Sequence, residues 1–360
     1  GQRTFFEKRR TTISEMIDNL EAETTGSAQD VRAVSKALLI GDRKEIASAL
    51  REKFNRAGVG HLLAISGLHI GIVAGVTFAF FRWAVAWLSP VVWAGWTRRT
   101  AAILTFLPVL AYGFLAGMSP STQRAVIMVS VFLLTLLFDR DQDLINTIGI
   151  AGMLILIINP PALFSISFQL SFTAVLVIVW GLSLLGPFLQ KAQGIKAALV
   201  AKGVAFMAVT LLATVGTAPL VMTYFNQVSL IGLVVNVVAI PLVGFLAVPL
   251  GLLAVFVQLF STGLASVCLQ LSHWILGKTI LVIDFFSGLP GAALKTITPS
   301  FVEIGLFYLL LAGFFNWFSI RHHEKPSHLP IGVRQGIAYG MLLLAFFGGV
   351  LDAGYWIHQR

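Results

Sequence analysis

The sequence predicts an all-α polytopic membrane protein with about ten transmembrane segments, one of them broken by proline, preceded by short amphipathic helices. Of its 360 residues, 57% are hydrophobic and only 11% are charged, whereas a soluble domain carries about 25% charged residues. Apolar runs of roughly 18 residues or more, long enough to cross a bilayer, recur along the chain. The runs are continuous rather than alternating, so they predict helices and not the strands of a barrel.

Residues 1–60 predict a polar lead-in outside the membrane. Apolar side chains recur there at helical spacing, in three groups. The first group contains Ile13 and Ile17, the second Val31 and Leu38, and the third Ile46, Leu50 and Phe54. A candidate capping box, Asp42-x-x-Glu45, precedes the third group. Three short amphipathic helices are expected, each lying on the bilayer surface or packing on the membrane domain.

Residues 61–350 predict the transmembrane domain, and residues 351–360 a tail. Ten apolar segments are expected, at 61–81, 100–117, 124–138, 144–158, 166–185, 199–222, 228–258, 264–286, 301–319 and 333–350. Segment 228–258 is too long for one straight span and contains Pro241 and Pro249. Because proline interrupts helical hydrogen bonding, a broken helix is predicted there.

Basic side chains orient the segments. Residues 61–360 hold 14 Lys and Arg against 7 Asp and Glu. Three connections are basic, with Arg82, Arg98 and Arg99 in the first, Lys191, Lys196 and Lys202 in the second, and Arg321, Lys325 and Arg334 in the third. They lie on one side of the membrane if 228–258 makes an odd number of crossings. The positive-inside rule places that side in the cytoplasm, so both chain ends are expected outside it.

The stretch HLLAISGLHIGIVAG, residues 61–75, combines polar side chains with closely spaced glycines. The glycines, which would let another helix approach closely, are Gly67, Gly71 and Gly75. Ser66 and His69 share the face that points away from Gly67 and Gly71. Two interpretations are open: these side chains bond within the protein, or together with His61 they line a water-filled path.

Three further stretches contain polar side chains that could line a path through the membrane, with Arg124 in the first, Gln169 in the second and Asn236 in the third. In GMSPSTQRA, Ser119 and Pro120 predict a helix start, and Ser121 and Arg124 follow within two turns. A helix N-terminus with a guanidinium suits a phosphate, although Arg124 could instead reach the bilayer surface.

Gln169 and Asn236 are two amide side chains within predicted membrane segments. Gln169 is expected to bond across helices, or to line a path. Asn236 lies five residues before Pro241, where it could satisfy a carbonyl freed by the proline, or also line a path.

Several chemistries are not indicated. The chain contains no Gly-x4-Gly-Lys-Ser/Thr loop for a nucleotide and no cluster of metal ligands, so neither a metal nor a cofactor is expected. The sequence does not predict an enzyme.

The four stretches together resemble the central membrane domain of the ComEC family, the DNA-internalisation channels of bacterial natural transformation. They are GHLLAISGLHIGIVAG, PSTQRA, NPPALFSISFQLSF and the block from Phe225 to Pro241, in family order over roughly 35–320. Asn159 is a departure, because the family often has Asp before the proline.

The resemblance implies a channel in the bacterial inner membrane that passes single-stranded DNA into the cytoplasm. The implied partners are this DNA, membrane lipids, other DNA-uptake proteins, and the OB-fold and metallo-β-lactamase-like domains of full-length members. The C-terminal tail would lead toward the latter domain. A secondary transporter of a small anionic solute is the alternative, suggested by the broken segment 228–258 and by the buried polar residues.

Overall fold

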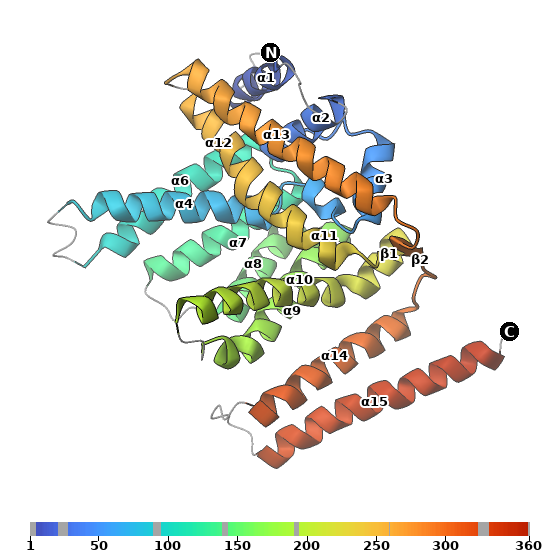
Figure 1. Ribbon diagram of the computed structural model, residues 1–360. Coiled ribbons are helices and arrows are strands. Elements are labelled where there is room, and N and C mark those ends of the chain that lie inside the picture. Colours follow the sequence, from blue (N-terminus) through green and yellow to red (C-terminus); the bar gives the residue numbers. More distant parts are fainter. Residues whose placement is uncertain are drawn as a thin grey trace. The chain divides into compact units, whose positions relative to one another are not determined.

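The computed structural model describes residues 5–20, 28–88, 95–138, 143–190, 194–258, 260–322 and 331–358, and these residues are almost entirely helical (Figure 1). The first elements are α1 (Phe5–Asp18), α2 (Ala28–Leu39), α3 (Ser48–Arg56), the 3₁₀ helix η1 (Gly60–Leu63), α4 (Gly67–Val85), α6 (Thr97–Leu115), α7 (Pro120–Leu137), α8 (Leu144–Ile158) and the 3₁₀ helix η2 (Pro160–Phe164). The remainder are α9 (Ile166–Gln190), α10 (Ile195–Phe225), β1 (Gln227–Ser229), α11 (Gly232–Ala239), η3 (Ile240–Ala247), α12 (Val248–Val257), α13 (Thr262–Ser287), β2 (Ala293–Lys295), α14 (Phe301–His322) and α15 (Ile331–His358).

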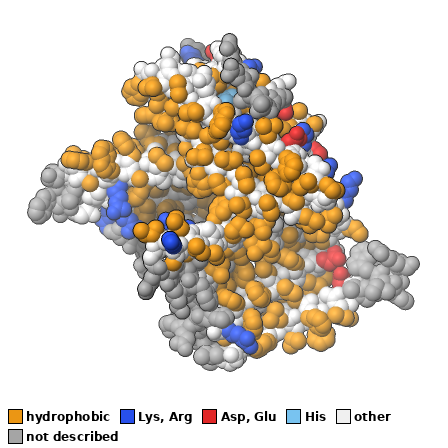
Figure 2. Space-filling view, in the orientation of Figure 1, with side chains coloured by type: hydrophobic (Ala, Val, Ile, Leu, Met, Phe, Trp, Pro, Cys, Tyr) orange, Lys and Arg blue, Asp and Glu red, His pale blue; other side chains and the backbone are white. Residues whose placement is uncertain are grey.

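Eight helices in the described residues are long and apolar enough to cross a membrane, which confirms the all-α polytopic prediction. The other two predicted segments form α6, which begins with two arginines, and α8, which has 15 residues. Both helices still present apolar side chains outward, since Leu107 of α6 is 75% exposed and Ile157 of α8 is 77% exposed. Hydrophobic side chains also cover much of the face in Figure 2. The total of about ten crossings stays a prediction.

The chain forms two compact units. Unit 1 comprises residues 1–168 and 229–294, and unit 2 comprises residues 169–228 and 295–360. Unit 1 therefore contains the predicted lead-in together with the membrane helices from α4 to α8 and from α11 to α13. The strands β1 and β2 pair with each other, and each contains residues of both units.

The lead-in, which we define as residues 5–20 and 28–63, packs on the membrane helices of unit 1. Apolar side chains of α2, α3 and η1 share one buried core with side chains of α11, η3, α12 and α13. Phe54 of α3 is almost completely buried in this core. At the surface, Lys53 Nζ lies 2.6 Å from Asp284 Oδ1 and joins α3 to α13. Of the two alternatives for the amphipathic helices, packing on the membrane domain is the one the structure adopts.

The predicted interruption at Pro241 is a change of helix type rather than a gap. Between α11 and α12 the eight residues of η3 form a π-helix, with Pro241 in its first turn. Pro249 lies in the first turn of α12. Proline lacks an N–H and crowds the preceding turn, and a wider π turn accommodates this locally. Helical structure therefore continues over Gly232–Val257, a length that crosses a membrane once.

The predicted capping box at Asp42 is wrong, because α3 begins only at Ser48 and its N-cap, Ala47, makes no side-chain cap. Asp42 Oδ1 instead accepts a hydrogen bond from the Lys44 N–H within the loop. Glu45 reaches Lys36 of α2, with 2.8 Å between Oε1 and Nζ. The carboxylate expected to cap α3 therefore holds a tertiary contact, and the helix starts after it.

Candidate functional site

The N-termini of α4, α7 and α11 lie against the lead-in, at what we call the lead-in end of unit 1. Helix α4 follows directly after η1, whose side chains belong to the lead-in core. The connection before α7 lies so close to Gly41 that a methyl group there would overlap the carbonyl oxygen of Ala116. A methyl group at Gly58 would lie 2.7 Å from Gly232 Cα, at the first residue of α11. A helix N-terminus carries unpaired N–H groups and a partial positive charge, so each of these three helix starts favours a negative charge beside it.

Ser66 and His69 form the cap of α4. The His69 Nδ1 atom accepts a hydrogen bond from the Ser66 N–H at 2.9 Å, and it lies 3.2 Å from Ser66 Oγ. The pair is a capping box in which histidine replaces the usual Glu or Gln. With Nδ1 accepting, the proton of a neutral ring is on Nε2. That atom is buried and has no partner among the described residues.

The three glycines of α4 do not pack as predicted. In the described residues, no atom lies within 4 Å of a methyl group built at Gly67, Gly71 or Gly75, apart from their own helix and chain neighbours, and all three are exposed. The opposite face, with His69, is the buried one, so the prediction of two different faces was right. Close packing occurs instead at glycines of two other elements, η3 and α12. Methyl groups at Gly244 of η3 and Gly251 of α12 would lie 2.7 Å from Leu68 Cδ2 and 2.6 Å from Leu39 Cδ2.

Helix α7 begins at the predicted residue. Ser119 is its N-cap and Pro120 its first residue, and Ser119 Oγ accepts from the Thr122 N–H at 3.5 Å. The same Oγ lies 3.0 Å from Ser121 Oγ and 2.9 Å from Thr122 Oγ1. Arg124, one turn further, is only 6% exposed. Burial in the protein does not fit an arginine that reaches to the bilayer surface, so that interpretation loses its support.

Asn236 lies in α11 and is also buried, with 6% of its surface exposed. Its Oδ1 atom has no hydrogen-bond partner among the described residues. Its backbone carbonyl accepts from the Ile240 N–H, at the junction with the π-helix. The Asn236 side chain thus adds an unsatisfied acceptor to the lead-in end of unit 1, where His69 Nε2 is an unsatisfied donor.

One of the predicted residues stands apart from this group. Gln169 belongs to unit 2, where the Tyr224 hydroxyl donates to Gln169 Oε1 at 2.7 Å and so joins α9 to α10. This confirms that Gln169 bonds across helices. His61 lies in η1 and is exposed, whereas His69 is buried. The structure therefore places His61, Ser66, His69, Ser121, Arg124 and Asn236 in unit 1, and Gln169 in unit 2.

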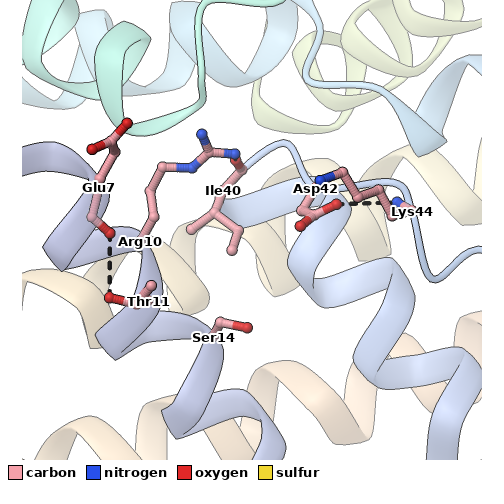
Figure 3. Close-up of a pocket in the computed structure, with 7 residues that line it drawn as sticks. All are labelled: Glu7, Arg10, Thr11, Ser14, Ile40, Asp42 and Lys44. Atoms are coloured by element: carbon pink, nitrogen blue, oxygen red, sulfur yellow. Dashed lines mark hydrogen bonds between the residues drawn. The ribbon is translucent and has the colours of Figure 1, made fainter. Parts of the chain in front are cut away.

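A polar pocket of about 390 Å³ opens in the lead-in (Figure 3). Its lining residues are Glu7, Arg10, Thr11, Ser14, Ile40, Asp42 and Lys44. Arg10 donates to the Ile40 carbonyl at 3.0 Å, and its Nη1 lies 3.0 Å from a methyl group built at Gly117, just before α7. Two acidic and two basic side chains line the pocket, so it has no net preference for an anion or a cation.

Sequence reasoning missed the buried lysine of the lead-in. Lys36 of α2 is 4% exposed, and its Nζ lies 2.8 Å from both Asp18 Oδ1 and Glu45 Oε1. Burial alone would lower the pKa of Lys36, but the hydrogen bonds and charges of the two carboxylates outweigh it and raise the pKa above the ordinary 10.5. Nearby, burial and the charge of Arg51 lower the pKa of Arg43. A lysine on an amphipathic helix ordinarily predicts a solvated face, so no local signal marks Lys36.

Three comparisons place the chain among known proteins. A family model described as Competence protein matches residues 38–321. The chain is 31% identical over 221 residues to ComE operon protein 3 of Bacillus subtilis, which covers 61% of this chain and 26% of that protein. It is 28% identical over 333 residues to Recombination protein 2 of Haemophilus influenzae, covering 87% of this chain and 38% of that protein.

A third relative is Competence protein ComA of Neisseria gonorrhoeae, 31% identical over 162 residues that make up 44% of this chain and 23% of that protein. The chain thus spans well under half the length of each of these three relatives. No solved structure matches it significantly. Because the family model covers more than half of the chain, from the end of α2 to α14, the chain belongs to the competence protein family, the ComEC family that its motifs resemble.

Proposed function

We propose that the chain is the part of a DNA-uptake protein that passes one strand of DNA through the bacterial inner membrane into the cytoplasm. The observation that carries the proposal is the match of the competence family over residues 38–321, which contain seven of the eight candidate spans in the described residues. A role in DNA uptake during transformation follows from that family. Passage of a single strand is the finer claim, and it rests on the site.

The lead-in end of unit 1 suits a polyanion. A line of phosphates cannot cross hydrocarbon, since even one charge at the bilayer centre costs several kcal/mol. Helix N-termini, a buried arginine and the unsatisfied Nε2 donor of His69 supply compensating groups. The excess of Lys and Arg over Asp and Glu in residues 61–360 acts in the same direction. We assign no catalytic step to these residues, and propose that any nuclease chemistry belongs to another domain of the full-length protein.

The transporter alternative has lost one of its two supports. It rested in part on a discontinuous helix at 228–258, because such helices bind small ions in many transporters. The segment stays helical through η3. A channel for single-stranded DNA is therefore the function that we favour.

DNA uptake in cells tests the proposal. In a naturally transformable host, deleting the gene of the full-length protein should leave labelled DNA bound at the surface, where added nuclease degrades it. The nuclease-protected DNA should fall to background, and the wild-type gene should restore it. Normal amounts of protected DNA in the deletion strain would refute the proposed function.

We further propose that the lead-in and the C-terminus lie outside the cytoplasm. If the helices cross the membrane in order, the helix ends that carry Arg82, Arg98, Lys196 and Arg321 lie on the side opposite to the lead-in and the C-terminus. The positive-inside rule assigns that basic side to the cytoplasm. A phosphatase fused after Arg360 should then be active, because this reporter works only outside the cytoplasm. A fluorescent protein that folds only in the cytoplasm should stay dark at the same position, and the reverse pair of results would overturn this orientation.

A further inference from the structure

Arg124 is a buried cation for which the described residues provide no counter-ion. It makes no ion pair and no hydrogen bond there, and its Nε atom is buried without a partner. A charge that is buried and unpaired is costly, so arginines inside proteins are paired or bind a ligand. A missing partner for a side chain 94% buried therefore calls for an anion.

The four carboxylates that the structure describes in the membrane part do not pair with Arg124. Asp143 caps α8 by accepting from the Ile145 and Asn146 N–H groups, and Asp284 pairs with Lys53. Glu303 bonds to the Ser300 N–H at the start of α14, in unit 2. Asp352 is on α15, also in unit 2. None of these four carboxylates forms an ion pair with Arg124, so its anion is to be sought outside this set.

The N-terminus of α7 offers the complementary donors. The first intrahelical bond runs from the Gln123 N–H to the Ser119 carbonyl, so the Ser121 N–H precedes it and points beyond the helix end. Ser119 Oγ lies 3.0 Å from Ser121 Oγ and 2.9 Å from Thr122 Oγ1, so the three hydroxyl groups form one hydrogen-bonded cluster. Since two mutual bonds use only two of the three hydroxyl protons, one is left to donate to a ligand.

Helix geometry relates Arg124 to these donors. It lies three residues after Ser121, so the two side chains leave one face of α7, and helical side chains tilt toward the helix N-terminus. A guanidinium beside free N–H groups is the arrangement that binds phosphate, because its fork matches two phosphate oxygens and the helix dipole favours negative charge.

We propose that the N-terminus of α7 binds a phosphodiester group, held by the Arg124 guanidinium, the Ser121 N–H and the hydroxyl cluster of Ser119, Ser121 and Thr122, and that this group is a phosphate of the translocating DNA strand. The choice of DNA rests on the proposed function. A phospholipid headgroup carries the same chemical group and is the competing source. The site reads no base, since phosphates carry no sequence information.

Binding and its salt dependence test the site. The full-length protein is reconstituted in nanodiscs of phosphatidylcholine, and its affinity for a short fluorescent single-stranded oligonucleotide is measured over a range of salt concentrations. Arg124→Gln should weaken binding about tenfold, because a hydrogen-bonded charged contact is lost. It should also reduce the slope of log affinity against log salt by about 0.7, the value for one phosphate contact to a single strand. Arg124→Lys should keep the slope, since it keeps the charge, yet lose affinity severalfold because it cannot bind bidentately.

Arg82→Gln is the matched control, since Arg82 is an exposed arginine at the opposite end of α4 and should leave both quantities unchanged. If Arg124→Gln does not fold, Arg124→Lys and Ser121→Ala carry the test, and wild-type affinity in both overturns the site. Wild-type affinity and slope in Arg124→Gln, with less phosphatidylglycerol retained in detergent, identifies a lipid site and also overturns the proposal. In either case, loss of DNA uptake on gene deletion leaves the proposed function standing.

Discussion

Replacing Gly41 by alanine is expected to destabilise unit 1 by about 2–5 kcal/mol, the largest effect of any single methyl group in the lead-in. Gly41 has a φ of +74°, in the left-handed region, where a side chain costs about 1–2 kcal/mol. The added methyl would also overlap the carbonyl oxygen of Ala116. A backbone atom cannot rotate away, so the loop before α7 must shift. Thermal unfolding of the full-length protein in detergent measures the loss.

Alanine variants of two other glycines separate the cost of the left-handed backbone from the cost of the steric overlap. Gly291 has a φ of +78° and open space around its Cα, so Gly291→Ala should show only the conformational cost. Gly71 lies inside α4 with no neighbour in contact, and Gly71→Ala should be neutral or stabilising by up to about 1 kcal/mol, because alanine favours helix. Equal losses in Gly41→Ala and Gly291→Ala would mean that the loop before α7 yields freely, contrary to the tight contact.

Local chemistry was enough to predict the helix starts that side-chain caps define. Ser119 followed by Pro120 fixed the first residue of α7, because a hydroxyl cap and an N1 proline act within four residues of chain. The long apolar runs likewise predicted the membrane helices, since length and composition suffice for a span. The cap by His69 escaped prediction only because histidine replaces the usual Glu or Gln at that position.

Features that depend on distant parts of the chain could not be predicted. The glycines of α4 suggested a packing face, but in an apolar helix both faces suit either lipid or protein, and the packed one is that of His69. The glycines in close contact, Gly244 and Gly251, lie on a segment distant in sequence from their partners Leu68 and Leu39.

The candidate site was predicted as separate residues and not as a group. Ser66, Arg124 and Asn236 were each identified by their type and helical position. Their common location arises because the lead-in contacts the start of α4, α7 and α11, which no spacing along the chain expresses. The same limit applies to Glu45, which matched a helix-capping pattern but pairs with Lys36.

Removing both carboxylates around Lys36 is expected to be far more damaging than removing the lysine. In the double variant Asp18→Asn, Glu45→Gln the ammonium stays buried without a counter-charge, and breaking a buried pair in this way costs about 3–5 kcal/mol. Each single variant leaves one carboxylate at 2.8 Å and should lose less. Lys36→Met instead leaves two carboxylates that are half exposed and hydrated by water, and it fills the site with an apolar side chain of similar length, so its loss should be about 1 kcal/mol or less.

The dependence on pH follows from the raised pKa of Lys36. The folded state prefers the protonated amine, so the contribution of the cluster is complete below the ordinary pKa of 10.5 and is lost only as pH rises through the higher folded value. The difference in melting temperature between the wild type and Lys36→Met should therefore be constant from neutral pH to about 10 and change only above it. Melting curves of the four variants across this range provide the measurement. A double variant no less stable than Lys36→Met would mean that water reaches the ammonium, and that Lys36 is not the buried cation joining α1, α2 and the loop before α3.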